Sequence, residues 1–246
     1  MIISIIIANV IVIFSEEYSK HSVSLWTLNI TAATASILCI IVIWRYGIHG
    51  LHGKSYLFLA LGIISWFAAD LTLLYDYYAF GIEEQRLVTN TDVLWFAGYG
   101  FLSLHLFIVI RSLHIKIKSK LVIVVSIITV LFIIYNLVNL FSYDFHTDDD
   151  FIAIIVTILY PILDFMLIIP SSLILITLRK DYEHNITWSL YSLSLLVNSI
   201  ADDGYVKDFV TDNSENLWFW ELFYITDFII MSGALFWYNK FHISNS

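Results

Sequence analysis

Carboxylates interrupt several apolar stretches of this chain. The stretch SWFAADLTLLYDYYAF, residues 65–80, contains two aspartates in a segment that is otherwise apolar enough for lipid. A charged side chain at the bilayer centre costs about 2.5–3.5 kcal/mol on insertion scales, so such residues usually mark a functional site. We therefore predict a ligand-binding site whose acidic members are Asp70, Asp76, Asp92, Asp202 and Glu221.

Aromatic side chains accompany these carboxylates at helical spacing. Trp66, Asp70 and Tyr77 follow the spacing i, i+4, i+11, which places them on one face of a helix. Aromatic faces next to carboxylates suit a cationic or polar ligand. The aromatic walls of the predicted site are Trp66, Trp95, Tyr99, Trp218 and Tyr224.

A structural interpretation of the same residues competes with the ligand site. Trp and Tyr are enriched at membrane interfaces in any case. Buried aspartates can also join helices by hydrogen bonds. The partners available for that role are Asn136, Asn139 and Asn198.

The elements that must position these residues are membrane-spanning helices. The chain has 59% hydrophobic and 13% charged residues and a mean hydropathy of +0.82, against about 25% charged residues in soluble domains. A spanning helix needs about 20 predominantly apolar residues. Seven segments qualify and predict an all-α seven-helix bundle: residues 25–44, 55–80, 92–110, 121–141, 151–178, 186–201 and 217–238. The fifth contains Pro161 and Pro170, which predict a kink or tilt.

The first fourteen residues, MIISIIIANVIVIF, are apolar but short. As a helix they would extend about 21 Å, less than the roughly 30 Å hydrocarbon core. We interpret them as an interfacial or re-entrant helix, with a cleaved signal or an eighth span as the alternatives. Residues 1–24 then form a short hydrophobic segment and outer loop, and residues 25–246 form the transmembrane domain.

Charge in the connections predicts the orientation. Nine of the twelve Lys and Arg residues fall in alternate connections and the tail, at Arg45, Lys54, Arg111, Lys116, Lys118, Lys120, Arg179, Lys180 and Lys240. The opposite side carries Lys20, Arg86 and Lys207 among many carboxylates, including Glu16, Glu17, Glu83, Glu84, Asp144, Asp148, Asp149, Asp150, Asp208, Asp212 and Glu215. By the positive-inside rule the C-terminus is cytoplasmic and the loop before residue 25 is outside, in a multi-pass cell-membrane protein.

This orientation places the predicted site at the outer end of the bundle. Asp76 then lies near the outer surface and Asp70 within the outer half of its helix. Asp164 and Asp227 fall deeper, near mid-membrane.

Two helical hairpins suggest an internal repeat. Ala69-Asp70 and Ala201-Asp202 each end an outward helix, and an acidic loop and an LW-containing helix start follow each, TDVLW at residues 91–95 and ENLW at residues 215–218. Both copies have the same orientation, so the repeat axis would lie along the membrane normal.

Motifs for catalysis and cofactors do not occur in the sequence. It contains neither HExxH nor GxSxG, and Tyr75-Asp76 has no GxGD to supply a second catalytic aspartate. Cys39 is the single cysteine, which argues against an internal disulfide. His105 is the only histidine deep in a span, which argues against a bis-histidine haem. His49 and His52 flank a turn. We expect no enzymatic activity, no metal and no cofactor.

Part of the chain resembles microbial rhodopsins. The stretch ITDFIIMSGALFW in the last predicted helix is similar to the rhodopsin pattern in which an aspartate precedes the Schiff-base lysine by four residues, and WSLY at residues 188–191 resembles a pocket stretch. Met231 stands at the lysine position, so we expect no retinal Schiff base.

A second resemblance rests on TDVLWFAGYGFL, residues 91–102, after a helix that ends in Asp and Tyr. It is similar to a stretch of the seven-helix membrane sensor domains that precede diguanylate cyclase or histidine kinase domains in prokaryotic signalling proteins. The resemblance implies a sensor-like module over residues 56–110 and 198–237. Since the sequence stops at Ser246, we expect a stand-alone module that acts through a separate membrane or cytoplasmic partner.

The alternatives are an accessory subunit of a larger membrane complex and, less favoured, a small-solute transporter. Nucleic acid is not an expected partner.

Overall fold

The computed structural model describes residues 1–80, 90–112, 118–141, 151–178, 182–210 and 217–243. These residues form eight α-helices, with a π-helical turn, η4, over Asn239–Ile243. The helices are α1 (Ile2–Ile13), α2 (Glu17–Tyr46), α3 (Gly50–Phe80), α4 (Asn90–Ser112), α5 (Ser119–Phe141), α6 (Phe151–Leu178), α7 (Tyr182–Val210) and α8 (Leu217–Tyr238). The acidic residues predicted for the outer loops at 83, 84, 144, 148–150, 212 and 215 lie outside the described residues.

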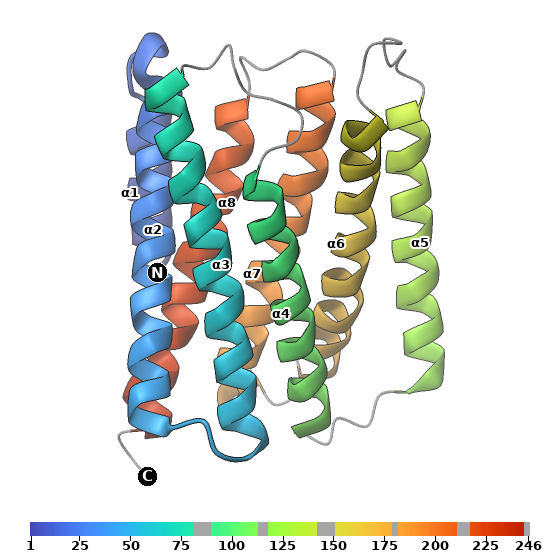
Figure 1. Cartoon of the computed structure of the whole chain (residues 1–246). Helices are drawn as coiled ribbons and strands as arrows, with labels where there is room; N and C mark the ends of the chain where they lie inside the picture. Colours follow the sequence, from blue (N-terminus) through green and yellow to red (C-terminus); the bar gives the residue numbers. More distant parts are fainter. Residues whose placement is uncertain (81–89, 113–117, 142–150, 179–181, 211–216, 244–246) are drawn as a thin grey trace.

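Six of the helices close a ring along the bundle axis. α2 packs against α3 and α8, α4 packs against α3 and α6, and α7 packs against α6 and α8. α5 stands at the edge of the bundle beside α6 (Figure 1). Neighbours along the chain run antiparallel because the connections between them are short. Residues from all six ring helices therefore meet in one interior.

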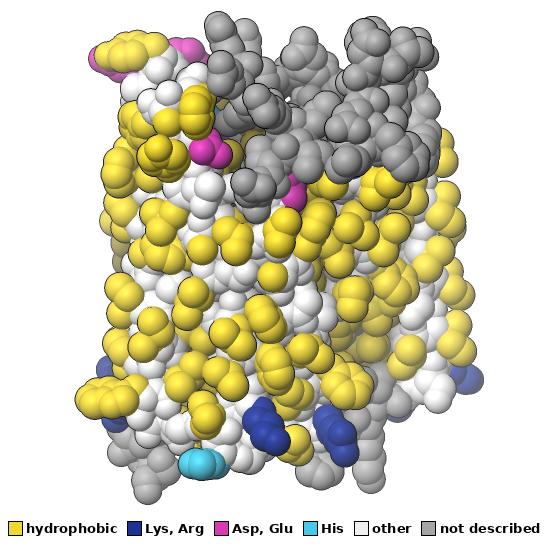
Figure 2. Space-filling model, viewed as in Figure 1, with side chains coloured by type: hydrophobic (Ala, Val, Ile, Leu, Met, Phe, Trp, Pro, Cys, Tyr) yellow, Lys and Arg dark blue, Asp and Glu magenta, His cyan; other side chains and the backbone are white. Residues whose placement is uncertain are grey.

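Six helices are long and apolar enough to cross a membrane. They are α2, α3, α4, α5, α6 and α8, with spans at Glu17–Tyr46, Gly50–Phe80, Thr91–Ser112, Ser119–Val138, Ile158–Leu178 and Leu217–Phe241. Hydrophobic side chains cover the bundle between its two ends (Figure 2). The expected all-α membrane bundle is confirmed at this level.

The predicted sixth span, residues 186–201, forms part of α7 and falls outside those six helices. The composition of α7 is more polar because its interior face carries hydroxyl, amide and carboxyl groups. The buried polar residues of α7 are Thr187, Ser189, Ser192, Ser194, Asn198, Ser199 and Asp202. This helix therefore contributes polar groups to the core where its neighbours contribute apolar ones.

Charge divides the bundle into two ends. We call the end with Arg45, Lys54, Arg111, Lys118, Lys120 and Lys240 the basic end, and the opposite end, with Glu16, Glu17, Asp76 and Asp208, the acidic end. On the face drawn in Figure 2, Lys and Arg side chains lie at the basic end and Asp and Glu toward the acidic end.

The N-terminal segment forms the short helix α1, which runs along the flank of the bundle in its acidic-end half (Figure 1). It packs against α8 and α2, and Asn9 Nδ2 donates a hydrogen bond of 3.1 Å to Thr226 Oγ1. Twelve residues extend about 18 Å. The segment is thus a short helix beside α2 and α8. Its interpretation as an interfacial or re-entrant helix stays a prediction.

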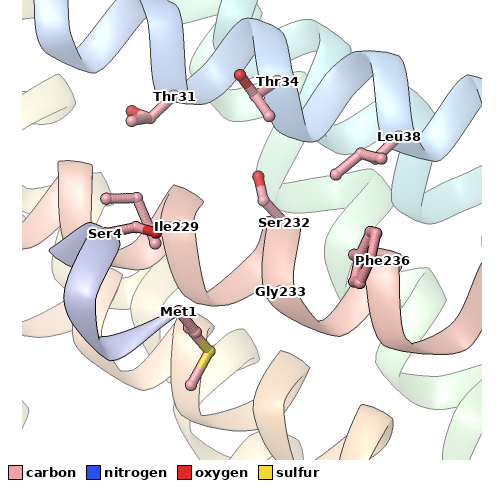
Figure 3. Close-up of a pocket in the computed structure, with 9 residues that line it drawn as sticks. All are labelled: Met1, Ser4, Thr31, Thr34, Leu38, Ile229, Ser232, Gly233 and Phe236. Atoms are coloured by element: carbon pink, nitrogen blue, oxygen red, sulfur yellow. The ribbon is translucent and has the colours of Figure 1, made fainter.

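A groove continues the line of α1 toward the basic end. It encloses a cavity of about 300 Å³ between α2 and α8, just beyond the start of α1 (Figure 3). Its lining residues are Met1, Ser4, Thr31, Thr34, Leu38, Ile229, Ser232, Gly233 and Phe236. Thr31 and Thr34 donate their hydroxyl protons to carbonyls of their own helix, so the groove surface is mainly apolar.

Candidate functional site: a buried acidic and aromatic cluster

Six carboxyl groups are buried in the acidic-end half of the bundle or at its middle. They belong to Asp70, Asp92, Asp164, Asp202, Glu221 and Asp227, and each residue is between 1% and 8% exposed. Among the described residues, Lys20, at 9%, is the one buried lysine or arginine. Buried carboxyl groups need hydrogen-bond donors or cations, because burial without them is costly. Most of the donors that surround these carboxyls are neutral hydroxyl, indole and amide groups.

Asp202 of α7 is the centre of the cluster. Its Oδ2 accepts hydrogen bonds from the Tyr99 hydroxyl and, at 2.7 Å, from Asn198 Nδ2. Its Oδ1 accepts a hydrogen bond of 2.6 Å from the Tyr224 hydroxyl. Three donors from α4, α7 and α8 thus converge on one carboxyl group.

Tyr99 of α4 also contacts a second carboxyl group. Its hydroxyl oxygen lies 3.2 Å from Asp164 Oδ1 of α6. The Tyr99 ring meets the Trp66 ring edge to face, with centroids 5.3 Å apart and an interplanar angle of 71°. Tyr99 is therefore held between the aromatic wall on α3 and the carboxyls of α6 and α7.

Two tryptophans tie Asp70 to α4. Trp95 Nε1 donates a hydrogen bond of 3.2 Å to Asp70 Oδ1, and Trp66 Nε1 donates one of 3.1 Å to the Trp95 carbonyl. From α2, Asn29 Nδ2 donates to the Asp70 carbonyl over 3.3 Å. α2, α3 and α4 are thereby joined around Asp70.

A glycine makes room for this arrangement. A Cβ atom at Gly98 would lie 2.2 Å from Trp66 Cδ1 and 2.3 Å from its Nε1. No side chain fits at that distance, so the absence of a Cβ lets the indole lie flat against α4. The next glycine of α4, Gly100, has no heavy atom within 4 Å of the equivalent position.

The other buried carboxyls have their own donors. Tyr160 donates a hydrogen bond of 2.5 Å to Asp92 Oδ1. The Ser194 hydroxyl donates to Asp227 Oδ1. Each of these pairs joins two helices, α6 to α4 and α7 to α8.

Glu221 of α8 faces α2. Ser24 donates its hydroxyl proton to Glu221 Oε2, and His21 Nδ1 lies 3.3 Å from Oε1. Lys20, one residue before His21, pairs with Glu17 at 2.6 Å and lies over the Trp218 ring, 4.4 Å from its centroid. The described cationic groups near the cluster thus gather on α2.

The structure brings together most of the ten predicted site residues. Asp70, Trp95, Trp66, Tyr99, Asp202 and Tyr224 form one connected set through the contacts above. Glu221 and Trp218 face α2, and Asp92 contacts Tyr160, whose ring centroid lies 6.3 Å from that of Tyr99. Asp76 is half-buried and separate. Six residues rotate a helix by about 600°, so Asp76 and Asp70 project from different faces of α3.

The structure also adds residues that the predicted site did not include. They are Asp164, Asp227, Tyr160, Asn198, Ser194, Ser24 and His21. Asp164 and Asp227 were visible in the sequence as deep carboxylates, but their depth separated them from the outer set. Asn198 was predicted to join two helices, but it bonds Asp202 within its own helix α7. The side chain of Asn139 lies outside the described part.

Along the helices, buried apolar side chains follow this cluster toward the basic end. These residues, from 0% to 1% exposed, are Leu59, Ile63, Leu102, Leu195 and Met231. Beyond them lies a group of aromatic rings around Tyr56, Trp188 and Tyr191. The basic-end half of the core is thus mainly apolar and aromatic.

His105 belongs to this second group and is fully buried. Its Nδ1 lies 2.9 Å from Ser55 Oγ and 3.0 Å from the Ser55 carbonyl oxygen. Within the described residues, no group of three or more His, Cys, Asp and Glu side chains could hold a metal ion. The buried carboxyls instead meet hydroxyl, indole and amide donors.

Comparisons with known proteins give this chain no relatives. It matches no family model, no curated protein and no solved structure. The resemblances to sensor domains and to rhodopsins therefore stay predictions. What is established is a helical bundle of the membrane type with a buried acidic and aromatic cluster in one half.

Proposed function

We propose that this protein is a sensor-like membrane module that binds a small cation at the acidic and aromatic cluster. One observation carries the proposal: six carboxyl groups are buried in the acidic-end half or at the middle of a bundle in which Lys20 is the one described buried Lys or Arg. A set of carboxyls with so few internal cations favours a positive ligand, since an opposite charge lowers the cost of burial.

The walls of the cluster suit such a ligand. Trp66, Trp95 and Tyr99 contribute indole and phenol rings beside Asp70 and Asp202. A cation within about 6 Å of such a ring gains about 0.5–2 kcal/mol, more where water is excluded. Apart from Asp76, the residues already predicted for ligand binding are thus the ones we assign to the site.

Access from a single side favours sensing over transport. Buried apolar residues such as Leu59, Leu102 and Met231 lie toward the basic end of the core, and we propose that they keep the ligand from passing to that end. A transporter needs the site to open to both sides in turn. A ligand that reaches the cluster from the acidic end would instead shift α3, α4, α7 and α8, which all contact it, and the basic end would pass that shift to a partner protein.

The proposed topology has seven spans, with α7 crossing beside the six apolar helices. α7 runs the length of the bundle and packs between α6 and α8 (Figure 1). Its polar residues are buried and so face the interior. In the proposed orientation the basic end faces the cytoplasm and the acidic end faces outside, and the charge asymmetry of the two ends supports it through the positive-inside rule. The two hairpins share a contact that supports the proposed internal repeat. In the first, Trp95 of α4 bonds Asp70 of α3, and in the second, Tyr224 of α8 bonds Asp202 of α7.

Thermal unfolding in detergent tests the proposal. The probes are the chlorides of sodium, potassium, magnesium, calcium, choline and ethanolamine at constant ionic strength. We expect at least one cation to raise the melting temperature of the wild type and to lose that effect in the double variant Asp70→Asn, Asp202→Asn. The matched control is Asp76→Asn, which removes a carboxyl from α3 outside the cluster and should keep the shift. A melting temperature that no cation moves would rule out the site.

An accessory subunit is the second candidate, and the groove between α2 and α8 favours it. α1 already occupies the acidic-end half of this flank, and the remaining groove is apolar and lined by small residues such as Ser232 and Gly233 (Figure 3). A helix of a partner membrane protein would continue the packing of α1. If so, Thr34→Leu, which fills the groove, should abolish co-purification of that protein in mild detergent while the melting temperature is unchanged.

A further inference from the structure

The groove between α2 and α8 lies on the flank of the bundle, within the apolar length of both helices. Its α2 residues run from Thr31 to Leu38 and its α8 residues from Ile229 to Phe236, all inside candidate membrane spans. The Phe236 ring, at the basic-end limit of the groove, is 54% exposed on this flank. α1 covers the other half of the flank over about 18 Å. The groove is therefore the part of the flank that α1 leaves to the lipid of the basic-end leaflet.

Two cations follow the groove toward the basic end. Lys240 Nζ lies 5.9 Å from the centroid of the Phe236 ring, which lines the groove. Arg45 stands seven residues beyond Leu38, nearly two helical turns, and so lies on the same face of α2. Arg45 Nη1 donates a hydrogen bond of 2.6 Å to Asn239 Oδ1, and Asn239 directly precedes Lys240. Both walls of the groove thus contribute a positive charge at its basic-end limit.

The elements that form these walls carry no carboxyl group on that side of the groove. The carboxyl groups of α2 and α8 belong to Glu17, Glu221 and Asp227, and all three precede the groove in their helices. η4, with the sequence NKFHI, contains none. A guanidinium has five N–H donors, and the contact of Arg45 with Asn239 uses one of them. This end of the groove therefore suits an anionic group from outside these elements.

The distance between the groove and the cations matches the depth of one leaflet. α2 rises about 10 Å from Thr31 to Leu38 and about 10 Å more from Leu38 to Arg45. A leaflet with its headgroups is about 20 Å thick. Trp44, next to Arg45, is 85% exposed, and tryptophan is enriched at the level of the headgroups. An occupant that fits both regions has an apolar part in the groove and an anionic group beside Arg45.

We propose that the groove binds an anionic phospholipid, with one acyl chain between α2 and α8 and the phosphate group against Arg45 and Lys240. Arginine binds phosphate through parallel N–H donors, and basic pockets between spanning helices bind anionic headgroups. The lipid then fills the basic-end half of the flank as α1 fills the acidic-end half. This site is separate from the acidic and aromatic cluster, so it does not depend on the proposed cation.

Charge disfavours the other occupants of the groove. A second copy of this chain in the same membrane has the same orientation, so it would bring its own basic end against Arg45 and Lys240. A helix of a partner membrane protein also tends to carry Lys and Arg on its cytoplasmic side. Like charges repel across such an interface, whereas the phosphate of a lipid is attracted.

Native mass spectrometry of the whole chain in detergent tests the proposal by counting bound lipid. The probes are dioleoylphosphatidylglycerol, dioleoylphosphatidylcholine and glycerol 3-phosphate, which has the anionic group without acyl chains. We expect one phosphatidylglycerol to bind first, phosphatidylcholine to bind more weakly and glycerol 3-phosphate not to bind. Each cation removed should raise the Kd of phosphatidylglycerol about fivefold, so Arg45→Gln with Lys240→Gln should raise it about 30-fold.

A charge control and a packing control accompany this double variant. Lys118→Gln with Lys120→Gln removes the same charge from the same end, but at the start of α5, which packs against α6 and α7, and should keep the wild-type affinity. Ser232→Leu fills the groove and should abolish binding of the first lipid, whereas Ser126→Leu, at a half-buried position of α5, should keep it. The melting temperature without lipid verifies that each variant is folded. Where the double variant does not fold, Lys240→Gln alone, which changes an exposed side chain, should still give the fivefold effect.

Three results overturn the inference. The first is an equal affinity of phosphatidylglycerol for the wild type and for the variant without Arg45 and Lys240, because the lipid then binds without the two cations. The second is equal binding of phosphatidylglycerol and phosphatidylcholine to the wild type. The third is a dimer or a stoichiometric partner protein that Ser232→Leu dissociates, because a helix then occupies the groove. None of them bears on the cation site, which the thermal shifts test separately.

Discussion

Trp95 donates its indole proton to Asp70 Oδ1 over 3.2 Å and so joins α4 to a buried carboxyl of α3. Through this contact Asp70, whose burial in an apolar segment would otherwise cost free energy, gains a hydrogen-bond donor. It also places an aromatic ring directly beside the carboxyl group, which suits the proposed cation site.

The first prediction concerns this bond. Trp95→Phe keeps an aromatic ring but removes the donor, and it leaves a buried acceptor without its partner. The free energy of unfolding should fall by about 1–3 kcal/mol. Denaturant titration in detergent micelles measures the loss.

Trp26→Phe is the matched control. Trp26 Nε1 donates to the Tyr78 hydroxyl over 2.8 Å, but at an exposed position. There water replaces the lost donor, so the change should stay within about 0.5 kcal/mol. Equal losses in the two variants would contradict the assignment of Asp70 as a buried, bonded carboxyl.

The second prediction compares two glycines of α4. Gly98→Ala places a methyl group 2.2 Å from Trp66 Cδ1 and must displace the indole, which should lower stability by about 1–3 kcal/mol. Gly100→Ala meets no atom within 4 Å and should be neutral or stabilising by up to about 1 kcal/mol, because alanine is the better helix former. The order of the two melting temperatures is the measurement, and a reversed order would place Trp66 elsewhere.

The third prediction compares two buried serines. Ser194→Ala removes the donor to the Asp227 carboxyl, and we expect a loss of about 1–2 kcal/mol. The Ser171 hydroxyl is fully buried and has no hydrogen-bond partner among the described residues, so Ser171→Ala should be neutral or stabilising. Two similar losses would show that the hydroxyls matter only through packing.

The fourth prediction concerns the orientation in the membrane. Glu16 lies at the acidic end and Lys118 at the basic end, and both are exposed. A membrane-impermeant maleimide added to intact cells should label the variant Glu16→Cys and leave Lys118→Cys unlabelled until the cells are opened. The native Cys39 is buried and should not react in either state, so it needs no replacement. Labelling of Lys118→Cys in intact cells would invert the proposed topology.

Hydropathy in the sequence was enough to predict the helices that it marks most strongly. α5 is the clearest case: its apolar run is continuous, and the helix stands at the edge of the bundle with most of its surface exposed. α7 was harder to recognise as a member of the bundle, because its polar residues turn toward the core. Whether a polar face points inward or outward depends on the neighbouring helices, which a hydropathy profile does not contain.

The candidate site likewise has a part that the sequence predicted and a part that depends on the packing of the helices. Because residue types and helical spacing put Trp66 and Asp70 on one face of α3, the sequence by itself predicted that pair, and the alternation of loop charge placed it in one half of the bundle. The contact of Tyr99 with both Asp164 and Asp202 was decided by tertiary structure alone. These three residues come from α4, α6 and α7, and their register depends on how the helices rotate and shift against one another. Those rotations follow from side-chain packing between helices, such as Trp66 against Gly98, and packing between segments distant in the chain leaves no periodic signal in either segment.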